Sequence, residues 1–191
     1  MPRFRIIIEY AGGDFCGWQR HANAPSIPQA PEDPIHASTG AAVDVVGAGR
    51  TDAGVHALAQ VAYFALKTER FDADKAMKAI NFHLRPAPIV IRHAMEAEPD
   101  FHARFSATGR HYFYRILNRL GPPSLEKGRV WHVMRELDAD AMHSAAQVLV
   151  GKHDFTSFRS IHCQAESPVK TLGAIRVTRE GDEIHVIAEA R

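Results

Sequence analysis

Residues 43–66, VDVVGAGRTDAGVHALAQVAYFAL, place a glycine-rich loop between two β-rich runs. The runs 43–46 and 58–66 are rich in β-branched, aromatic and other apolar residues, so both are predicted strands. Between them, residues 47–57 contain three glycines, which permit backbone conformations that bulkier residues resist. Loops held by a rigid scaffold are where active groups are often placed, so this loop is the first candidate for a functional site.

The sequence on either side of this unit predicts an α+β arrangement. Residues 4–10 have the composition of a buried strand and end at a Gly-Gly turn signal. Asp72 can cap a helix that stops near Asn81, with apolar positions spaced three and four apart at Ala76, Met77 and Ile80. A strand at 89–94 follows. This order predicts a ferredoxin-like half, in which helices cover one face of an antiparallel sheet and the other face is open to a ligand.

Residues 26–38 do not fit the pattern, because a composition typical of a surface helix is interrupted by three prolines. Pro28 suits a first turn that begins at Ser26. An interior proline costs roughly 3 kcal/mol, so Pro31 and Pro34 would break the rest of the helix. We therefore expect a distorted or extended segment there.

The second half predicts a further ferredoxin-like, RNA-binding-type unit. It begins with an alternating strand at 110–117, and a helix capped by Asp138 and stopped by Gly151 follows, with a one-sided stripe of Met142, Ala145, Ala146 and Leu149. Strands are predicted at 174–178 and 183–188. We expect domains at 1–103 and 104–191 with an active cleft between them, the second domain being incomplete because its last strand runs to Arg191 without a stop signal.

Bulk composition excludes several classes of protein. With 191 residues and 46% hydrophobic residues, the chain can bury a substantial core. The N-terminal apolar run is interrupted at Glu9, too soon for a secretion signal or a membrane span, so we expect a cytoplasmic protein without a membrane partner. Cys16 and Cys163 stand far apart and outside any C-x-x-C pair, which predicts reduced thiols rather than a disulfide framework or a zinc knuckle.

Charge is informative only locally. The formal net charge is +1, which gives no argument for a nucleic-acid partner. Residues 101–135, however, contain seven cations and one anion, a local charge of +6. Four aromatic residues are interleaved with these charges: Tyr112, Phe113, Tyr114 and Trp131. Such a segment can contact phosphates and bases together, or it can be a solvated strand face with cationic edge protection.

Spacing alone leaves three interpretations of residues 47–57: a site with a functional carboxylate, a loop that cradles phosphate, or an ordinary connection. Asp52 is a carboxylate that is normally ionised at neutral pH, and Arg50 could hold it or a phosphate. The loop could also be an ordinary connection. A phosphate-cradling loop is weakly supported, because neither G-x-x-x-x-G-K-[ST] nor G-x-G-x-x-G is present. A zinc site around His56 is disfavoured, because H-E-x-x-H and H-x-E with C-x-x-C are also missing from the sequence.

The complete string GAGRTDAGVHA resembles the active-site motif of the tRNA pseudouridine synthase A (TruA) family, residue by residue. Four further strings resemble that family in the same order, so that the resemblance covers nearly the whole chain: FCGWQR (15–20), DFHARFSATGRHYFYRI (100–116), LDADAMHSAAQVLVGKHDFTSF (137–158) and CQAESPVKTL (163–172). Trp18, within the first of these strings, is interpreted as a core residue.

The resemblance implies a function and a set of site residues. Members of this family isomerise uridine to pseudouridine in the anticodon stem-loop of tRNA (positions 38–40), without a metal, an organic cofactor or a nucleotide cofactor. Asp52 matches the essential catalytic aspartate, Arg50 matches the arginine that braces the space left by the flipped nucleotide, and Tyr112 matches the tyrosine that packs against the target base. Relatives act as homodimers, so a dimer that binds the tRNA anticodon arm is implied.

Two other functions stay open at this stage. The chain ends before the strand and helix that bring a further arginine in the family, so it could be a catalytically inactive, truncated form that acts only as a tRNA-binding module. A more distant alternative is a small-molecule enzyme that uses the glycine-rich loop for phosphate.

Overall fold

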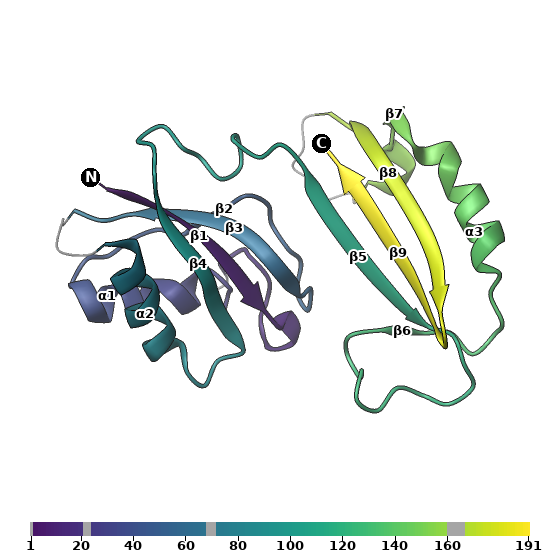
Figure 1. Ribbon diagram of the computed structural model, residues 1–191, viewed down its shortest axis with the longest axis horizontal. Helices are drawn as coiled ribbons and strands as arrows, with labels where there is room; N and C mark the ends of the chain where they lie inside the picture. The colour runs from purple at the N-terminus through teal and green to yellow at the C-terminus, as the bar shows by residue number, and fades with distance from the viewer. Residues whose placement is uncertain (1, 21–23, 68–71, 160–166) are drawn as a thin grey trace. The chain divides into compact units, whose positions relative to one another are not determined.

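The chain forms two compact units, residues 1–107 and 108–191 (Figure 1). The structure is a computed structural model, and it describes residues 2–20, 24–67, 72–159 and 167–191. Cys163 and part of the string that contains it lie outside the described residues. Within the described ranges, no helix is long and apolar enough to cross a membrane.

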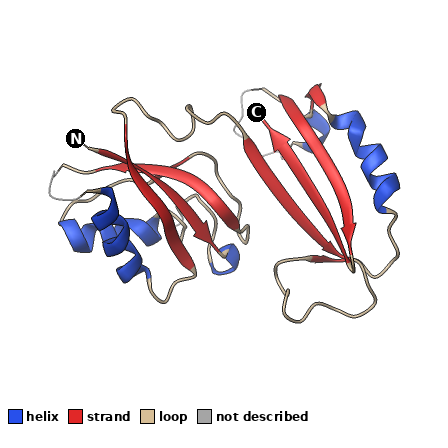
Figure 2. Ribbon diagram, in the orientation of Figure 1, coloured by secondary structure: helices blue, strands red, loops and turns tan. Residues whose placement is uncertain are grey.

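The first unit has the βαββαβ order of a ferredoxin-like fold, which confirms the predicted α+β class. Its four strands form an antiparallel sheet in the order β2-β3-β1-β4, and both α-helices lie on one face of it (Figure 2). The elements are β1 (Arg3–Tyr10), α1 (Gln29–Thr39), β2 (Val46–Gly47), β3 (Ala57–Ala65), α2 (Ala73–Leu84) and β4 (Ile89–Ala97), with a 3-10 turn at Gly12–Asp14.

The alternation of β1 determines which face of this sheet is buried. Phe4, Ile6, Ile8 and Tyr10 are buried, whereas the residues between them are only partly covered. The buried side chains pack under the two helices, where the Phe4 and Phe64 rings stack with centroids 5.4 Å apart. Among the residues that the structure describes in this unit, no α-helix covers the opposite face of the sheet (Figure 2).

Helix α1 corrects the prediction of a distorted or extended segment at 26–38. Pro28 is the N-cap residue and Pro31 lies in the first turn, where backbone N–H groups have no partner within the helix. Only Pro34 occupies an interior position and removes a helical hydrogen bond. Pro31 and Ile35 are buried, so packing offsets this single loss.

Helix α2 also departs from its predicted end. Asp72 caps it as expected, because its carboxylate accepts a hydrogen bond from the Lys75 backbone N–H at 2.8 Å. The helix continues past Asn81 to Leu84. The Asn81 side chain instead donates to the carbonyl of Ile91 and accepts from its N–H, both at 2.8 Å, so it fastens α2 to β4.

The second unit packs one α-helix against a mixed five-stranded sheet with the order β6-β5-β9-β8-β7. Its small core joins Ile116, Ala139, Val177 and Ile184. Asp138 caps the helix by accepting from the N–H groups of Asp140 and Ala141. Strand β6 is parallel to β5, and all other pairs are antiparallel. The elements are β5 (Arg110–Leu117), β6 (Trp131–His132), α3 (Ala139–Ala146), β7 (Gly151–Asp154), β8 (Val169–Glu180) and β9 (Glu183–Ala190), with 3-10 turns at Gln147–Leu149 and Thr156–Phe158.

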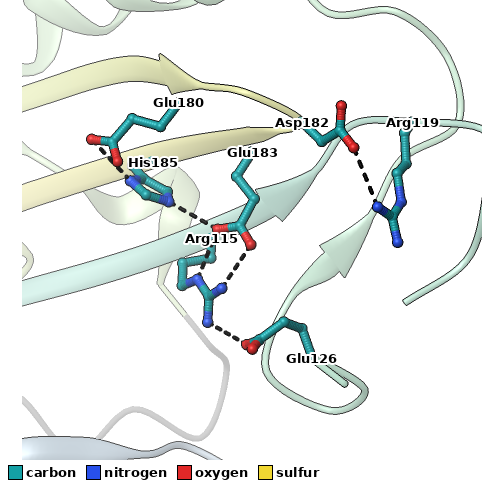
Figure 3. Close-up of polar contacts among 7 residues, drawn as sticks. All are labelled: Arg115, Arg119, Glu126, Glu180, Asp182, Glu183 and His185. Carbon is teal, nitrogen blue, oxygen red and sulfur yellow. Dashed lines mark hydrogen bonds and ion pairs between the residues drawn. The ribbon is translucent and has the colours of Figure 1, made fainter. Parts of the chain in front are cut away.

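An ion-pair network fastens the connection that follows β5 to the β8–β9 hairpin (Figure 3). Arg115 makes a bidentate contact with Glu183, at 2.9 and 2.7 Å, and a third hydrogen bond with Glu126 at 2.6 Å. His185 lies 2.9 Å from Glu183, and Arg119 pairs with Asp182 at 3.2 Å. Two of the cations in the basic stretch 101–135 are therefore already paired with carboxylates.

Glu183 should make the second unit sensitive to acid. The hydrogen bond from Arg115, followed by that from His185, lowers the pKa of Glu183 from 4.5 to about 2. Because this pKa is depressed in the folded state, the stabilisation is complete above pH 4.5 and is lost as the pH falls toward 2. We expect Glu183→Gln to lower the free energy of unfolding at pH 7 by on the order of 2 kcal/mol, with a smaller difference at pH 3.

Urea denaturation of wild type and variant at both pH values measures this effect. Glu180→Gln is the matched control, since the Glu180 carboxylate is exposed and lies 3.4 Å from His185. Equal losses at the two pH values would contradict the assignment of the effect to ionised Glu183.

Candidate active site

The loop that carries Arg50 and Asp52 is the end of the β2–β3 hairpin. Two hydrogen bonds close its base, one from the Ala48 N–H to the Val61 carbonyl at 2.8 Å and one from the Gln60 side chain to the Gly49 carbonyl at 2.6 Å. At the tip, the Val55 N–H donates to the Asp52 carbonyl at 3.2 Å and so forms a turn. Arg50 precedes this turn and Asp52 begins it, and both residues are exposed.

The segment that follows β1 holds the loop from the side. The Trp18 N–H donates to the Thr51 carbonyl at 2.9 Å, and the Tyr10 hydroxyl lies 2.9 Å from Thr51 Oγ1. Tyr10 is buried, and this burial raises its pKa, while the hydrogen bond with Thr51 acts in the opposite direction. A neutral, buried hydroxyl therefore fixes the residue next to Asp52.

Glycines allow the two segments to approach this closely. Gly17 has φ +87°, and a β-carbon there would lie 2.8 Å from the carbonyl carbon of Asp52 and closer still to the Thr51 oxygen. A β-carbon on Gly12 would overlap the Val55 carbonyl, and one on Gly47 would lie 2.5 Å from the Trp18 indole. Trp18 is buried, which confirms its interpretation as a core residue.

His56 completes the set of residues that hold the loop, which we call the brace: Tyr10, Gly12, Gly17, Trp18 and His56. Its Nδ1 accepts a hydrogen bond from the Gly12 N–H at 3.1 Å, so the neutral imidazole carries its proton on Nε2. Among the described residues, no group of three histidine, cysteine or carboxylate side chains could hold a metal ion. The geometry gives His56 a part in holding the loop.

Tyr112 belongs to the second unit, where it lies on β5 opposite Ala188 of β9. Its side chain is 47% exposed, as is suitable for a ring that contacts a ligand. The structure thus brings Arg50 and Asp52 together on one loop, and it has Tyr112 on a strand of the other unit.

The bracing residues Tyr10, Gly12 and Gly17 were not identified from the sequence as parts of the site. Gly12 was interpreted only as a turn signal, and Tyr10 only as a strand residue. Their contribution depends on packing against a loop some forty residues away, as the hydrogen bond from Gly12 to His56, 44 residues apart, illustrates. The available signal was the second glycine-containing string, FCGWQR, which includes Gly17.

Comparison with known proteins identifies one family over most of the chain. The sequence model described as tRNA pseudouridine synthase matches residues 6–106 and 145–191. These residues include the hairpin loop with Asp52, its brace, and Phe101 to Phe105 of the segment that follows β4. They also include β8 and β9.

Curated relatives match the whole chain. Three proteins named tRNA pseudouridine synthase A are 56% identical in Rhodospirillum rubrum, 55% in Maricaulis maris and 56% in Rhodospirillum centenum, each over 191 residues. The chain covers 68%, 76% and 78% of those relatives, respectively. It therefore spans about two thirds to three quarters of their length.

Proposed function

Because the chain belongs to the tRNA pseudouridine synthase family, we propose that Asp52 is the carboxylate with which it isomerises uridine to pseudouridine in tRNA. The observation that carries this proposal is the combination of an exposed carboxylate with a fixed backbone. Thr51, its neighbour, is held by Tyr10 and Trp18, so the carboxylate can meet a substrate without first ordering the loop.

The reaction leaves the chemical formula of the nucleotide unchanged. The bond from ribose C1′ to N1 of uracil breaks, the detached base turns, and a bond from C1′ to C5 forms. The proton at C5 then leaves, and N1 gains a proton, so that neither oxidation nor net hydrolysis occurs. Asp52 can serve as the nucleophile toward the sugar or the base, or it can stabilise charge during elimination of the base.

Arg50 is proposed to bind substrate next to this carboxylate. The target uridine must leave its stack before C1′ is accessible, and a side chain must then brace the space that it vacates. A guanidinium group two residues from Asp52 is long enough and permanently charged, so it can contact both the stack and a phosphate.

Tyr112 is proposed to pack against the target base through its half-exposed ring. Tyr112→Phe keeps the ring, so the dissociation constant for tRNA should stay within about twofold, while kcat falls by roughly tenfold or more because the hydroxyl no longer assists proton transfer. Binding and single-turnover assays of the variant measure the two effects separately. An equal loss of affinity and rate would instead make Tyr112 a structural residue.

The finer features of the function are proposals as well. The substrate is proposed to be the anticodon arm, with uridines at positions 38–40 as targets, and the active form a homodimer in the cytoplasm. The local charge of the basic stretch supports phosphate contacts, although Arg115 and Arg119 are paired within the second unit.

Release of tritium from tRNA labelled at uridine C5 tests the function directly. An active chain releases the label in proportion to pseudouridine formed, since C5 loses its hydrogen in the reaction. Binding of tRNA with full retention of the label would support the alternative, a catalytically inactive form that serves only as a tRNA-binding module.

A further inference from the structure

The hairpin loop is held at two points, and Asp52 lies between them in the chain. At the first point, the Thr51 carbonyl accepts from the Trp18 N–H at 2.9 Å. At the second, His56 Nδ1 accepts from the Gly12 N–H at 3.1 Å, one residue before β3 begins. The first contact joins two backbone groups. The second depends on an imidazole, a group that ordinarily changes its charge between pH 5 and 8.

The hydrogen bond at His56 requires a neutral imidazole. A backbone N–H can only donate, so Nδ1 accepts through its lone pair and carries no proton. Gly12 is buried, and it approaches the loop so closely that a β-carbon there would overlap the Val55 carbonyl oxygen. His56 itself is exposed, so protons from solvent can reach it. Protonation of Nδ1 directs one N–H group at another, and the two must then separate.

Loss of this contact releases the part of the loop that follows Asp52. The Val55 N–H donates to the Asp52 carbonyl at 3.2 Å, so the turn that begins at the carboxylate residue ends next to His56. A misplacement of about 1 Å in a catalytic group can lower a rate by ~10²-fold. Because Thr51 stays bound to Trp18, we expect a partial loss of rate when His56 is protonated.

Charged and titratable groups also lie on the other elements that meet at His56. They are Arg50 and Asp52 in the loop, Asp14 in the 3-10 turn, Glu9 and Tyr10 at the end of β1, Arg85 in the connection before β4, and Arg92 and His93 on β4. Carboxylates and guanidinium groups ordinarily keep a constant charge between pH 5.5 and 8. Burial raises the pKa of Tyr10, so its hydroxyl stays neutral in this range. The two imidazoles are thus the groups to distinguish by experiment.

We propose that His56 is a positioning residue whose neutral imidazole holds Asp52 in its productive place, so that protonation of this side chain slows the reaction below neutral pH. This inference rests on the proposed function, since it concerns the presentation of the proposed carboxylate. His56 acts through the Gly12 N–H and not on the uridine. Affinity for tRNA should not weaken at acid pH, because a protonated imidazole adds positive charge near the phosphates.

Single-turnover tritium release from saturating enzyme at pH 8 and pH 5.5 tests this role. We expect the wild-type rate to fall by about fivefold or more between the two. His56→Asn places an amide oxygen near the position of Nδ1, where it can accept from Gly12 but cannot be protonated. Its rate should stay within about threefold of wild type at pH 8 and change by less than about twofold at pH 5.5. His56→Ala offers no acceptor and should be about fivefold slower than wild type at pH 8.

His93→Asn is the matched control. His93 is also an exposed histidine of the first unit, but it lies on β4 opposite Ile7 and outside the brace. This variant should retain the wild-type fall in rate between pH 8 and pH 5.5. Filter binding at both pH values should show that no variant weakens tRNA binding by more than about twofold, which separates a change in rate from a change in affinity.

The backbone amide signal of Gly12 in nuclear magnetic resonance spectra reports the contact without any turnover. In the isotope-labelled wild-type chain, this signal should move between pH 8 and pH 5.5, because its acceptor is lost. In His56→Asn it should stay in place. Absence of tritium release by the wild type counts against the proposed function, while the Gly12 signal still decides whether protonation of His56 opens the contact.

Four outcomes would overturn the inference. They are an equal fall in rate in wild type and His56→Asn, wild-type rates in His56→Ala, a rate for His56→Asn as low as that of His56→Ala at pH 8, and a Gly12 signal in the wild type that does not change with pH. If His56→Ala does not fold, His56→Asn and the Gly12 signal are sufficient to decide.

Discussion

Asp52→Asn is expected to lower the rate of tritium release by roughly 10³-fold or more, while the affinity for tRNA stays within about twofold. Asparagine keeps the size of the side chain and removes its negative charge, so it can neither attack carbon nor stabilise a developing positive charge. The exposed position of Asp52 means that the substitution leaves no buried group without a partner. Rate and affinity should therefore separate.

Single-turnover release of label from saturating enzyme, together with filter binding, measures both quantities. Asp44→Asn provides the control, because it makes the same change of charge at a side chain that is 90% exposed and lies just before β2. Wild-type rates for Asp52→Asn, or comparable losses for the two variants, would refute a catalytic role for Asp52.

Gly17→Ala is expected to have the second largest effect, through the position of the loop rather than its chemistry. Its φ of +87° costs a residue with a side chain about 1–2 kcal/mol, and overlap with the backbone of Thr51 and Asp52 adds about 1–3 kcal/mol. The two segments can relieve this overlap only by separating, which breaks the hydrogen bond from Trp18 to Thr51. We expect both stability and tritium release to fall.

Gly54→Ala separates the two contributions. Gly54 has a similar φ of +80°, but a β-carbon there would meet nothing within 4 Å. Denaturation should therefore show a loss of about 1–2 kcal/mol for Gly54→Ala and a further loss for Gly17→Ala. The rate should fall at least tenfold more in Gly17→Ala. Identical behaviour of the two variants would mean that backbone conformation alone, and not contact with the loop, explains the effect.

The order of strands and helices could be predicted because the relevant signals are local. Runs of β-branched and aromatic residues located six strands, whereas β2 overlaps its predicted run 43–46 only at Val46, and the short strands β6 and β7 were not predicted. Asp72 and Asp138 marked two helix starts, each confirmed by a side-chain hydrogen bond. Helix α1 was missed because the cost of proline depends on its position within the helix, and the position could not be known before the start at Gln29 was known. The helix stop at Asn81 was wrong because its amide binds Ile91, a partner on another element.

The candidate site was predictable to a different degree. Arg50 and Asp52 follow from a contiguous string, and in the structure both are exposed on one hairpin loop. The brace could not be predicted in the same way, because it depends on the approach of two backbones that are far apart in sequence. A glycine that is needed for such an approach has the same appearance in sequence as a glycine that merely permits a turn, as Gly12 and Gly13 illustrate.

The close fit of Gly12 and Gly17 against the hairpin loop has a consequence for engineering. Transplanting residues 47–57 alone into another scaffold, or randomising them alone in a library, would remove the surface that gives the loop its shape. The smallest transferable cassette is the pair of segments 10–18 and 47–57, carried on β1 and β3, whose pairing sets their spacing. Substitutions intended to change substrate specificity are better placed at side chains that lie outside the contact between these two segments.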